Sequence, residues 1–330
     1  MTSSCKNILR VAAWACVISA GLAGCKASGN EPNAAAAQPP FMSAVAATPP
    51  QAGDEAPAPE KAGGFDGKRA FAQVAKQVSF GPRPAGSPAI GQVQEYLQAE
   101  LKSYGCTVEV ENFTAGTPVG RLSMKNIVAK IPGEKPSVIL LGTHYDTKLL
   151  DNFVGADDGG SSTGVMLEIA RHLCKQKNKY GVWIAFFDGE EAVQNWSDTD
   201  GRYGSRELAA RLAMSKEVSN IRAFLLADIV GARNPVFRRD SKAPKWVVDL
   251  VWGSARKLGY ANMFVEDSAP VEDDHDPFLK RNVPSVDVIN DFMALGYWHT
   301  PQDTLDKISP KSLAIVGHVF LESVKQLQLK

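Results

Sequence analysis

Apolar residues recur in two different periods along residues 65–330, and each period predicts one type of secondary structure. Helical spacing appears in FDGKRAFAQVAKQV (65–78) and in SPAIGQVQEYLQAELKSYG (87–105), where Ser87 and Pro88 suit the N-cap and first position of a helix. Two short strands are predicted to follow, in CTVEVENF and LSMKNIVAKI, and polarity alternates in the second. The folded part therefore begins with helices and then turns to strands.

Three continuous apolar runs are typical of strands buried on both faces, and helical segments separate or follow them. The runs are SVILLGTHYDT (137–147), GVWIAFFDGEE (181–191) and IRAFLLADIVGA (221–232). The helical segments are SSTGVMLEIARHLCKQ (161–176), GSRELAARLA (204–213) and SPKSLAIVGHVFLESVKQLQ (309–328). Buried strands alternating with helices predict an α/β fold, a three-layer α-β-α sandwich around a mostly parallel mixed sheet. Ligands bind outside the carboxyl ends of the strands in such sheets.

The first 25 residues have the pattern of an export signal. Lys6 and Arg10 precede a short apolar stretch that ends in Leu22-Ala23-Gly24-Cys25, which resembles a bacterial lipobox. In that pattern the cysteine is lipidated and becomes the mature N-terminus; the alternative is an ordinary signal peptide with an incidental cysteine. We expect a protein anchored to a bacterial membrane through lipid on Cys25, with its folded domain in the periplasm or otherwise outside the cytoplasm.

Composition separates a linker from the folded domain. Residues 26–64 are rich in Ala, Pro, Gly and Gln and have few large apolar residues, which predicts a disordered tether followed by a folded domain over 65–330. Of the five cysteines, only Cys106 and Cys174 lie in that domain. They could pair in an oxidising compartment, but spacing alone does not decide it.

The charge balance argues against a polyanionic partner. The chain has 36 basic and 36 acidic side chains, so its formal net charge is zero. This gives no electrostatic reason to expect nucleic acid or direct binding to an anionic membrane. We expect a monomer that works through a cleft.

Acidic and imidazole side chains follow all three buried strands. His144 and Asp146 end the first, Glu190 and Glu191 the second, and Asp228 the third. Three further polar blocks are FVGADDGGSSTG with Asp157 and Asp158, VEDDHDPF with Asp273 and His275, and GYWHTPQDT with His299.

Each of these features has a plain structural interpretation when it is taken alone. An acidic pair suits a helix start, adjacent glutamates suit a solvated surface, and His172 and His318 lie on predicted helices. We expect His275 to support its neighbours or the fold. Together, however, carboxylates crowded at one sheet edge repel each other unless a cation or shared protons neutralise them. Zinc accepts His nitrogen and carboxylate oxygen, and a catalytic zinc keeps three protein ligands and an open position.

Several separated blocks resemble the zinc-dependent glutaminyl cyclases, which belong to the wider clan of zinc aminopeptidases. These blocks are GTHYDTK, FVGADDG, FFDGEEA, the Trp196-x6-YGS continuation, ADIVGA, VEDDHDPFLKRNVP and YWHTPQDT. They follow in order from about residue 65 to the C-terminus. The tryptophans at 196 and 298 and the EDDH block favour the cyclase branch.

The resemblance implies a role for each matching residue. Asp158, Glu191 and His299 would bind one Zn²⁺ per chain, Glu190 would be the acid/base, Asp228 and Asp273 its carboxylate partners, and Trp196 and Trp298 the pocket walls. The chain also departs from the animal enzymes. Asp157 and the glycines after it resemble the aminopeptidases more than the animal cyclases. Asp287 stands where the animal cyclases tend to have a His, and Thr143 stands where they usually have a cysteine that forms a disulfide.

The implied reaction is the cyclisation of N-terminal Gln, in a peptide or protein, to pyroglutamate with release of ammonia. A two-zinc aminopeptidase is the alternative, with His144 and Asp228 holding a second zinc bridged through Asp158. Because all five ligand types are present, counting ligands does not exclude it. A third possibility, an inert envelope lipoprotein that uses the fold for binding, is opposed by the presence of every chemical group the reaction needs.

Overall fold

The computed structural model describes residues 53–330. The predicted signal peptide, the predicted lipidation of Cys25 and the tether up to residue 52 lie outside the described residues. Among the helices of residues 53–330, none has the length and apolarity needed to cross a membrane.

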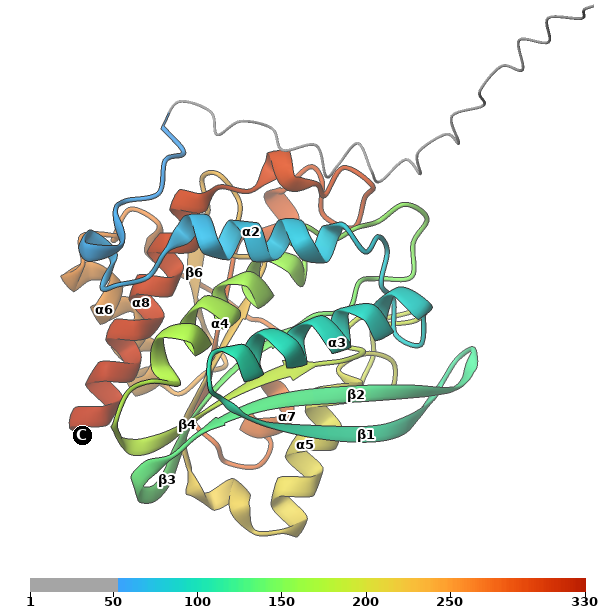
Figure 1. Cartoon of the computed structure of the whole chain (residues 1–330), viewed down its shortest axis with the longest axis horizontal. Helices are drawn as coiled ribbons and strands as arrows, with labels where there is room; N and C mark the ends of the chain where they lie inside the picture. Colours follow the sequence, from blue (N-terminus) through green and yellow to red (C-terminus); the bar gives the residue numbers. More distant parts are fainter. Residues whose placement is uncertain (1–52) are drawn as a thin grey trace, which may run out of the picture. The chain divides into compact units, whose positions relative to one another are not determined.

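A six-stranded mixed sheet forms the centre of the domain (Figure 1). Its strands are β1 (Thr107–Thr117), β2 (Gly120–Ile131), β3 (Gly133–His144), β4 (Asn178–Phe187), β5 (Ile221–Asp228) and β8 (Ser285–Ile289), in the order β1-β2-β4-β3-β5-β8. Strands β4, β3, β5 and β8 are parallel, whereas β1 and β2 are antiparallel. A parallel pair, β6 (Phe237–Asp240) with β7 (Phe264–Ala269), forms a second sheet. The mostly parallel mixed sheet predicted from the sequence is confirmed.

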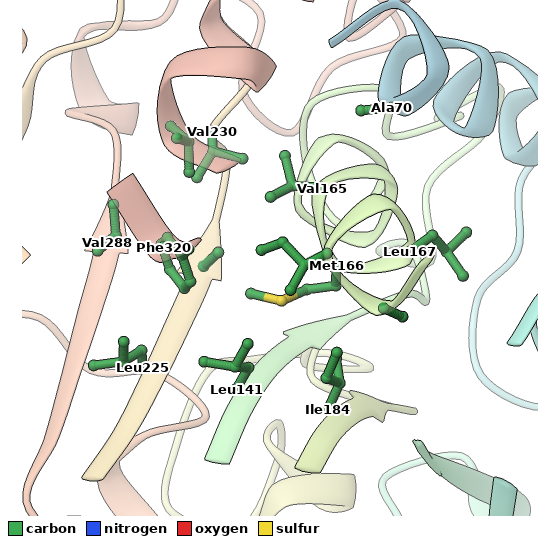
Figure 2. Close-up of a cluster of buried hydrophobic side chains, with 14 of the residues drawn as sticks. Ala70, Leu141, Val165, Met166, Leu167, Ile184, Leu225, Val230, Val288 and Phe320 are labelled. Carbon is green, nitrogen blue, oxygen red and sulfur yellow. The ribbon is translucent and has the colours of Figure 1, made fainter. Parts of the chain in front are cut away.

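Helices cover both faces of the sheet. On one face lie α2 (Gly67–Val78), α3 (Pro88–Ser103), α4 (Gly160–Leu173), α6 (Lys245–Lys257) and α8 (Pro310–Leu329), whose apolar side chains form one large core. Figure 2 shows this core where Val165, Met166 and Leu167 of α4 lie among side chains from the strands and from α8. A smaller core on the other face contains residues of α5 (Tyr203–Met214) and α7 (Asp276–Leu279). Burial on both faces explains why the central strands are apolar without interruption.

Side-chain caps begin the helices where the sequence predicts them. Ser87 accepts a hydrogen bond from the backbone of Ile90 at 3.2 Å, and Ser309 accepts one from Lys311 at 3.1 Å, each with proline next in the chain. Such caps pair backbone donors that the first helical turn leaves without partners.

Part of the segment predicted as a tether packs against the domain. Residues 59–62 form a short 3₁₀ helix, η1 (Pro59–Ala62), and Ala62 is fully buried. Asp54 also pairs with Arg233. Ordered chain therefore begins before residue 65, because a few apolar and charged side chains in this Pro- and Ala-rich segment find partners.

Several elements were missed by the sequence patterns. Strand β8 is buried throughout but carries Asp287 at its centre, which breaks the apolar run, and the strands β6 and β7 are short or polar. Three more 3₁₀ segments lie in connections: η2 (Glu217–Asn220), η3 (Phe292–Ala294) and η4 (Leu305–Lys307). Cys106 and Cys174, whose pairing the sequence left open, form a disulfide between the start of β1 and the end of α4.

Candidate active site and metal centre

Three of the five polar residues predicted at the strand ends, Glu190, Glu191 and Asp228, line one pocket. Strand β3 ends at His144 and β5 at Asp228, while β4 ends at Phe187, just before the two glutamates. A cavity of about 500 Å³ opens at this edge of the sheet. Its lining includes Asp158, Glu190, Glu191, Trp196, Asp228, Asp273, Trp298 and His299. All eight residues to which the resemblance assigns catalytic, metal or substrate roles therefore lie around one pocket.

Asp158, Glu191 and His299, called here the open triad, can each direct one ligand atom to a common point. The three atoms lie within 4.8 Å of one another. His299 Nε2 is 3.1 Å from Glu191 Oε1 and 3.2 Å from Asp158 Oδ2, and the His299 side chain is 24% exposed. One oxygen of Asp158 is buried and has no well-aligned hydrogen bond among the described residues. Two buried carboxylates this close to one imidazole form a ligand set that fits a divalent cation such as zinc.

His144, Asp158 and Asp228, called here the buried triad, form a second set of ligand atoms within 4.8 Å of one another. His144 Nε2 is 3.0 Å from Asp228 Oδ1 and 3.3 Å from Asp158 Oδ1. His144 is only 1% exposed and does not line the pocket, unlike the other two. Burial lowers the pKa of His144, but the surrounding carboxylates, Asp228 above all, raise it well above its ordinary value. Protonated His144 would neutralise these carboxylates without a metal.

Two carboxylates hold the backbone of the ligand-bearing loops. Asp303 accepts hydrogen bonds from the backbone N–H groups of Asp157 (2.8 Å) and Asp158 (3.0 Å). Asp146 accepts from the backbone of Glu190 (3.1 Å) and Glu191 (3.3 Å). Each adjacent acidic pair is thus fixed through its backbone, which leaves its side chains free to diverge.

Asp157 ties the loops together and does not join either triad. Its carboxylate accepts hydrogen bonds from the backbone of Gly231 (2.7 Å) and from the Tyr297 hydroxyl (2.7 Å). The N-cap of α4 is Gly159, which has no side-chain hydrogen bond, so neither aspartate caps the helix. The pair does lie at the start of α4, as the plain structural interpretation expects, but the Asp157 carboxylate bonds to other loops and not to the helix.

The remaining carboxylates form an acidic cluster beside the open triad. Burial raises the pKa of Glu190 well above its ordinary value, and Asp273 and Glu191 raise it further against the opposing effect of His144. Burial also raises the pKa of Asp228 to about 7. Asp287, missed as a site residue, joins this cluster, since burial and then Asp273 raise its pKa well above the ordinary range. Groups with raised pKa values can hold or release a proton near neutral pH.

The chain leaves the end of β5 in a strained conformation. Ile229, which lines the pocket directly after Asp228, has a φ of 46°. A β-branched residue is rarely found in the left-handed region, and such outliers concentrate at functional sites. The turn lets the Ile229 backbone donate to its neighbour Asp228 at 2.8 Å.

The two tryptophans contact the site in different ways. Trp298 stacks on His299, with ring centroids 4.1 Å apart, and its other ring neighbour is Phe292 at 4.6 Å. Trp196 lies on the loop between β4 and α5, is 41% exposed and also lines the pocket. The pocket thus has aromatic surface from two separate loops.

Some supporting residues were not identified from the sequence. Arg83 is fully buried and donates to the carbonyls of Tyr145 (2.8 Å) and Gly155 (2.9 Å), so it braces the loop that leads to Asp158. Lys148 lines the pocket with its ammonium 3.5 Å from Glu191. The only sequence signals were the positions of Arg83 in GPRPAGS and of Asp303 in HTPQD. His275, expected to play a supporting role, is buried with Nε2 3.0 Å from Asp240 and lies in neither triad.

Comparisons with known proteins identify the family. The family model "Peptidase family M28" matches residues 126–324, more than half of the chain. A glutaminyl-peptide cyclotransferase-like protein of Bos taurus is 33% identical over 271 residues, which cover 72% of this chain and 70% of that protein. The solved structure of an Acidobacteriales bacterium glutaminyl cyclase superposes with a TM-score of 0.76 at 38% identity, covering 86% of this chain and 99% of that one.

Another solved relative bears on the alternative function. It is a Zn-dependent exopeptidase from Parabacteroides distasonis, with a TM-score of 0.72 and 30% identity over 79% of this chain and 98% of that one. The chain belongs to peptidase family M28 and, within this zinc-dependent clan, to the glutaminyl cyclases.

Proposed function

We propose that this protein is a glutaminyl-peptide cyclotransferase that converts N-terminal Gln of peptides or proteins to pyroglutamate and releases ammonia. The observation that carries the proposal is the pocket, where a zinc-type ligand set, a buried Glu190 and two indole rings meet. The relative named as a glutaminyl-peptide cyclotransferase-like protein, at 33% identity, and the solved glutaminyl cyclase, at 38% identity, support the same activity.

We assign the metal to the open triad, one zinc per chain held by Asp158, Glu191 and His299. When bound there, zinc would supply a Lewis acid that polarises the γ-carboxamide carbonyl of the substrate. The geometry supports this assignment because the open triad lines the pocket, whereas His144 of the buried triad does not.

Glu190 would carry the proton. The reaction needs a base to take a proton from the substrate α-amine as it attacks the γ-carboxamide carbon, and an acid to deliver a proton to the departing ammonia. One carboxyl group can perform both steps, since amine and amide belong to the same residue. Asp228 and Asp273, which line the same pocket, would share protons with Glu190 and so tune its acidity.

The aromatic walls would hold the Gln side chain folded. A flexible side chain loses rotational freedom when its amine and amide are brought to attack distance, and a confined pocket with flat indole surfaces favours that conformation. No water has to be activated in this reaction, so the pocket benefits from excluding it.

A paired substrate assay tests the proposal. Purified protein with zinc is offered a Gln-peptide and, separately, Leu-4-nitroanilide or Ala-amide. We expect ammonia and pyroglutamate from the first and little free amino acid from the others. Efficient release of free amino acid, without pyroglutamate, would identify an aminopeptidase instead.

The aminopeptidase keeps one specific observation in its favour, namely the buried triad. Its three ligand atoms also lie within 4.8 Å of one another. In that reading His144 and Asp228 would hold a second zinc bridged by Asp158, and Glu190 would activate water. The number of zinc ions in the active enzyme separates the two.

We further propose that Cys25 carries a lipid anchor, that the domain works as a monomer and that it lies outside the cytoplasm of a bacterium. The LAGC sequence and the Ala- and Pro-rich segment after it support the anchor, and the Cys106–Cys174 disulfide suits an oxidising compartment. Mass spectrometry of the natively produced N-terminus should find an acylated Cys25. An unmodified Cys25, or retention of residues 1–24, would contradict the anchor.

A further inference from the structure

Trp196 belongs to a loop without helix or strand, and something must fix its ring if it is to act as a wall. The loop spans residues 188–202 between β4 and α5, and the indole is 41% exposed. An exposed tryptophan side chain on an irregular loop can adopt several rotamers, and each would change the shape of the pocket.

A buried arginine lies against this indole. The guanidinium carbon of Arg202 is 4.9 Å from the Trp196 ring centroid, within the range of a cation–π contact. The Arg202 side chain is only 3% exposed. The interaction is therefore shielded from water, which strengthens it relative to a surface contact.

Arg202 is itself held from the other side. Its Nη1 donates to Asp276 Oδ2 of α7 at 2.8 Å, and its Nη2 donates to the carbonyl of Ser197 at 3.3 Å. The backbone N–H of Arg202 donates to the carbonyl of Glu190 at 2.7 Å. Because two of its nitrogens are hydrogen-bonded, the Arg202 guanidinium presents its plane to the indole in one orientation. The flexible ammonium of a lysine at this position would not.

The neighbouring backbone leaves room for the ring. Gly201 has a φ of 113°, and a Cβ added there would lie 3.1 Å from two carbons of the Trp196 ring. The indole thus packs closely on the backbone before Arg202. Asp200 closes the loop by accepting hydrogen bonds from the backbone of Val193, Gln194 and Asn195 at 2.8 to 2.9 Å.

We propose that Arg202 is a positioning residue for the reaction: anchored by Asp276, it holds the Trp196 indole in place as a wall of the substrate pocket. This inference rests on the proposed function, because the wall matters through the Gln side chain that it confines. The second wall serves as an internal control, since Trp298 stacks on His299 and contacts Phe292 in a tilted arrangement, and no Arg or Lys of residues 53–330 lies over its ring.

A double-mutant cycle between Arg202 and Trp196 tests the proposal. Arg202→Met keeps the length of the side chain and a similar backbone strain at a φ of 52°, but removes the cation and the hydrogen bonds. We expect Arg202→Met to raise KM for a Gln-peptide about three- to tenfold with a smaller change in kcat. In a Trp196→Ala background the same substitution should change KM less than about twofold.

Two further variants guard against a purely structural explanation. Arg202→Lys keeps the charge but loses the planar guanidinium, so its KM should lie between those of the unchanged enzyme and Arg202→Met. Asp276→Asn should raise KM less than Arg202→Met does. Asp276→Asn also serves if Arg202→Met does not fold. Equal effects of Arg202→Met with and without Trp196, or no effect in the wild-type background, would overturn the proposal.

A measurement without turnover separates this inference from the proposed function. In protein labelled with 5-fluorotryptophan, ¹⁹F NMR lines of Trp196 and Trp298 are assigned from Trp196→Phe and Trp298→Phe. Arg202→Met, or Asp276→Asn if needed, should shift or broaden the Trp196 line and leave the Trp298 line in place. An unchanged Trp196 line would overturn the role of Arg202. A wild-type protein without cyclase activity would overturn the proposed function alone.

Discussion

The open and buried triads share Asp158 but differ in their access to the pocket. In the open triad, His299 is 24% exposed and stacks on a pocket tryptophan. In the buried triad, His144 is 1% exposed and lies within 3.3 Å of two carboxylates that can balance a protonated imidazole. Similar ligand atoms at similar separations therefore differ in what they can offer a substrate. A Lewis acid is useful only where the reacting carbonyl can reach it.

The adjacent glutamates, Glu190 and Glu191, lie near different triads. Glu191 belongs to the open triad, whereas Glu190 has an oxygen 3.9 Å from His144 Nδ1. Asp146 holds both backbones, so one loop delivers the proposed metal ligand and the proposed proton carrier to neighbouring points. Substitution of each glutamate by the isosteric amide should thus have different consequences.

The largest expected effect is that of Glu190→Gln. The amide keeps the shape but cannot carry the proton, so kcat should fall by roughly 10² to 10⁴. Zinc content and melting temperature should stay close to those of the unchanged protein, because Glu190 is not in the open triad. Kinetics and metal analysis on the same preparation check this, and loss of the metal in this variant would mean that Glu190 is a ligand.

Glu191→Gln should weaken the metal site itself. An amide oxygen binds zinc less strongly than a carboxylate, so zinc occupancy and activity should fall together, and excess zinc should restore part of the activity. Titrating zinc into the variant while following ammonia release measures this. A variant that retained both full zinc and full activity would remove Glu191 from the open triad.

Sequence reasoning reached most of the fold and the central site residues for a common physical reason. Three of the four parallel strands, β3, β4 and β5, carry continuous apolar runs because they are buried on both faces, and the first polar residues after them collect at one sheet edge. Strand β8 was not predicted because Asp287 interrupts its apolar run, and the acids that raise the pKa of Asp287, Asp273 and Asp228, lie on other segments of the chain.

The supporting contacts could not be predicted in the same way. Asp303 bonds to backbone 145 residues away in the chain, and Arg83 bonds to carbonyls more than 60 residues away. A local sequence pattern cannot predict a hydrogen bond between a side chain and backbone groups that are distant in the chain. Family resemblance supplied the ligand roles, but the bracing of Asp158 by Asp303 and of Trp196 by Arg202 required three-dimensional contacts.

Trp298→Ala should have a smaller effect, confined to the substrate. The ring stacks on His299 of the open triad and lines the pocket, so its removal should raise KM or lower kcat/KM by up to about tenfold. Melting temperature should change little, because the ring lies at the pocket surface. A large drop in melting temperature with unaltered kinetics of the folded fraction would make Trp298 a residue of the core.

We propose that the open triad holds the catalytic zinc and that the buried triad holds none. The zinc content of the active enzyme and of His144→Ala tests this, with the ion located by anomalous diffraction in crystals of the zinc-loaded protein. We expect one equivalent in both proteins, located among Asp158, Glu191 and His299. Two equivalents in the active enzyme, falling to one in His144→Ala, would contradict it and identify a two-zinc centre.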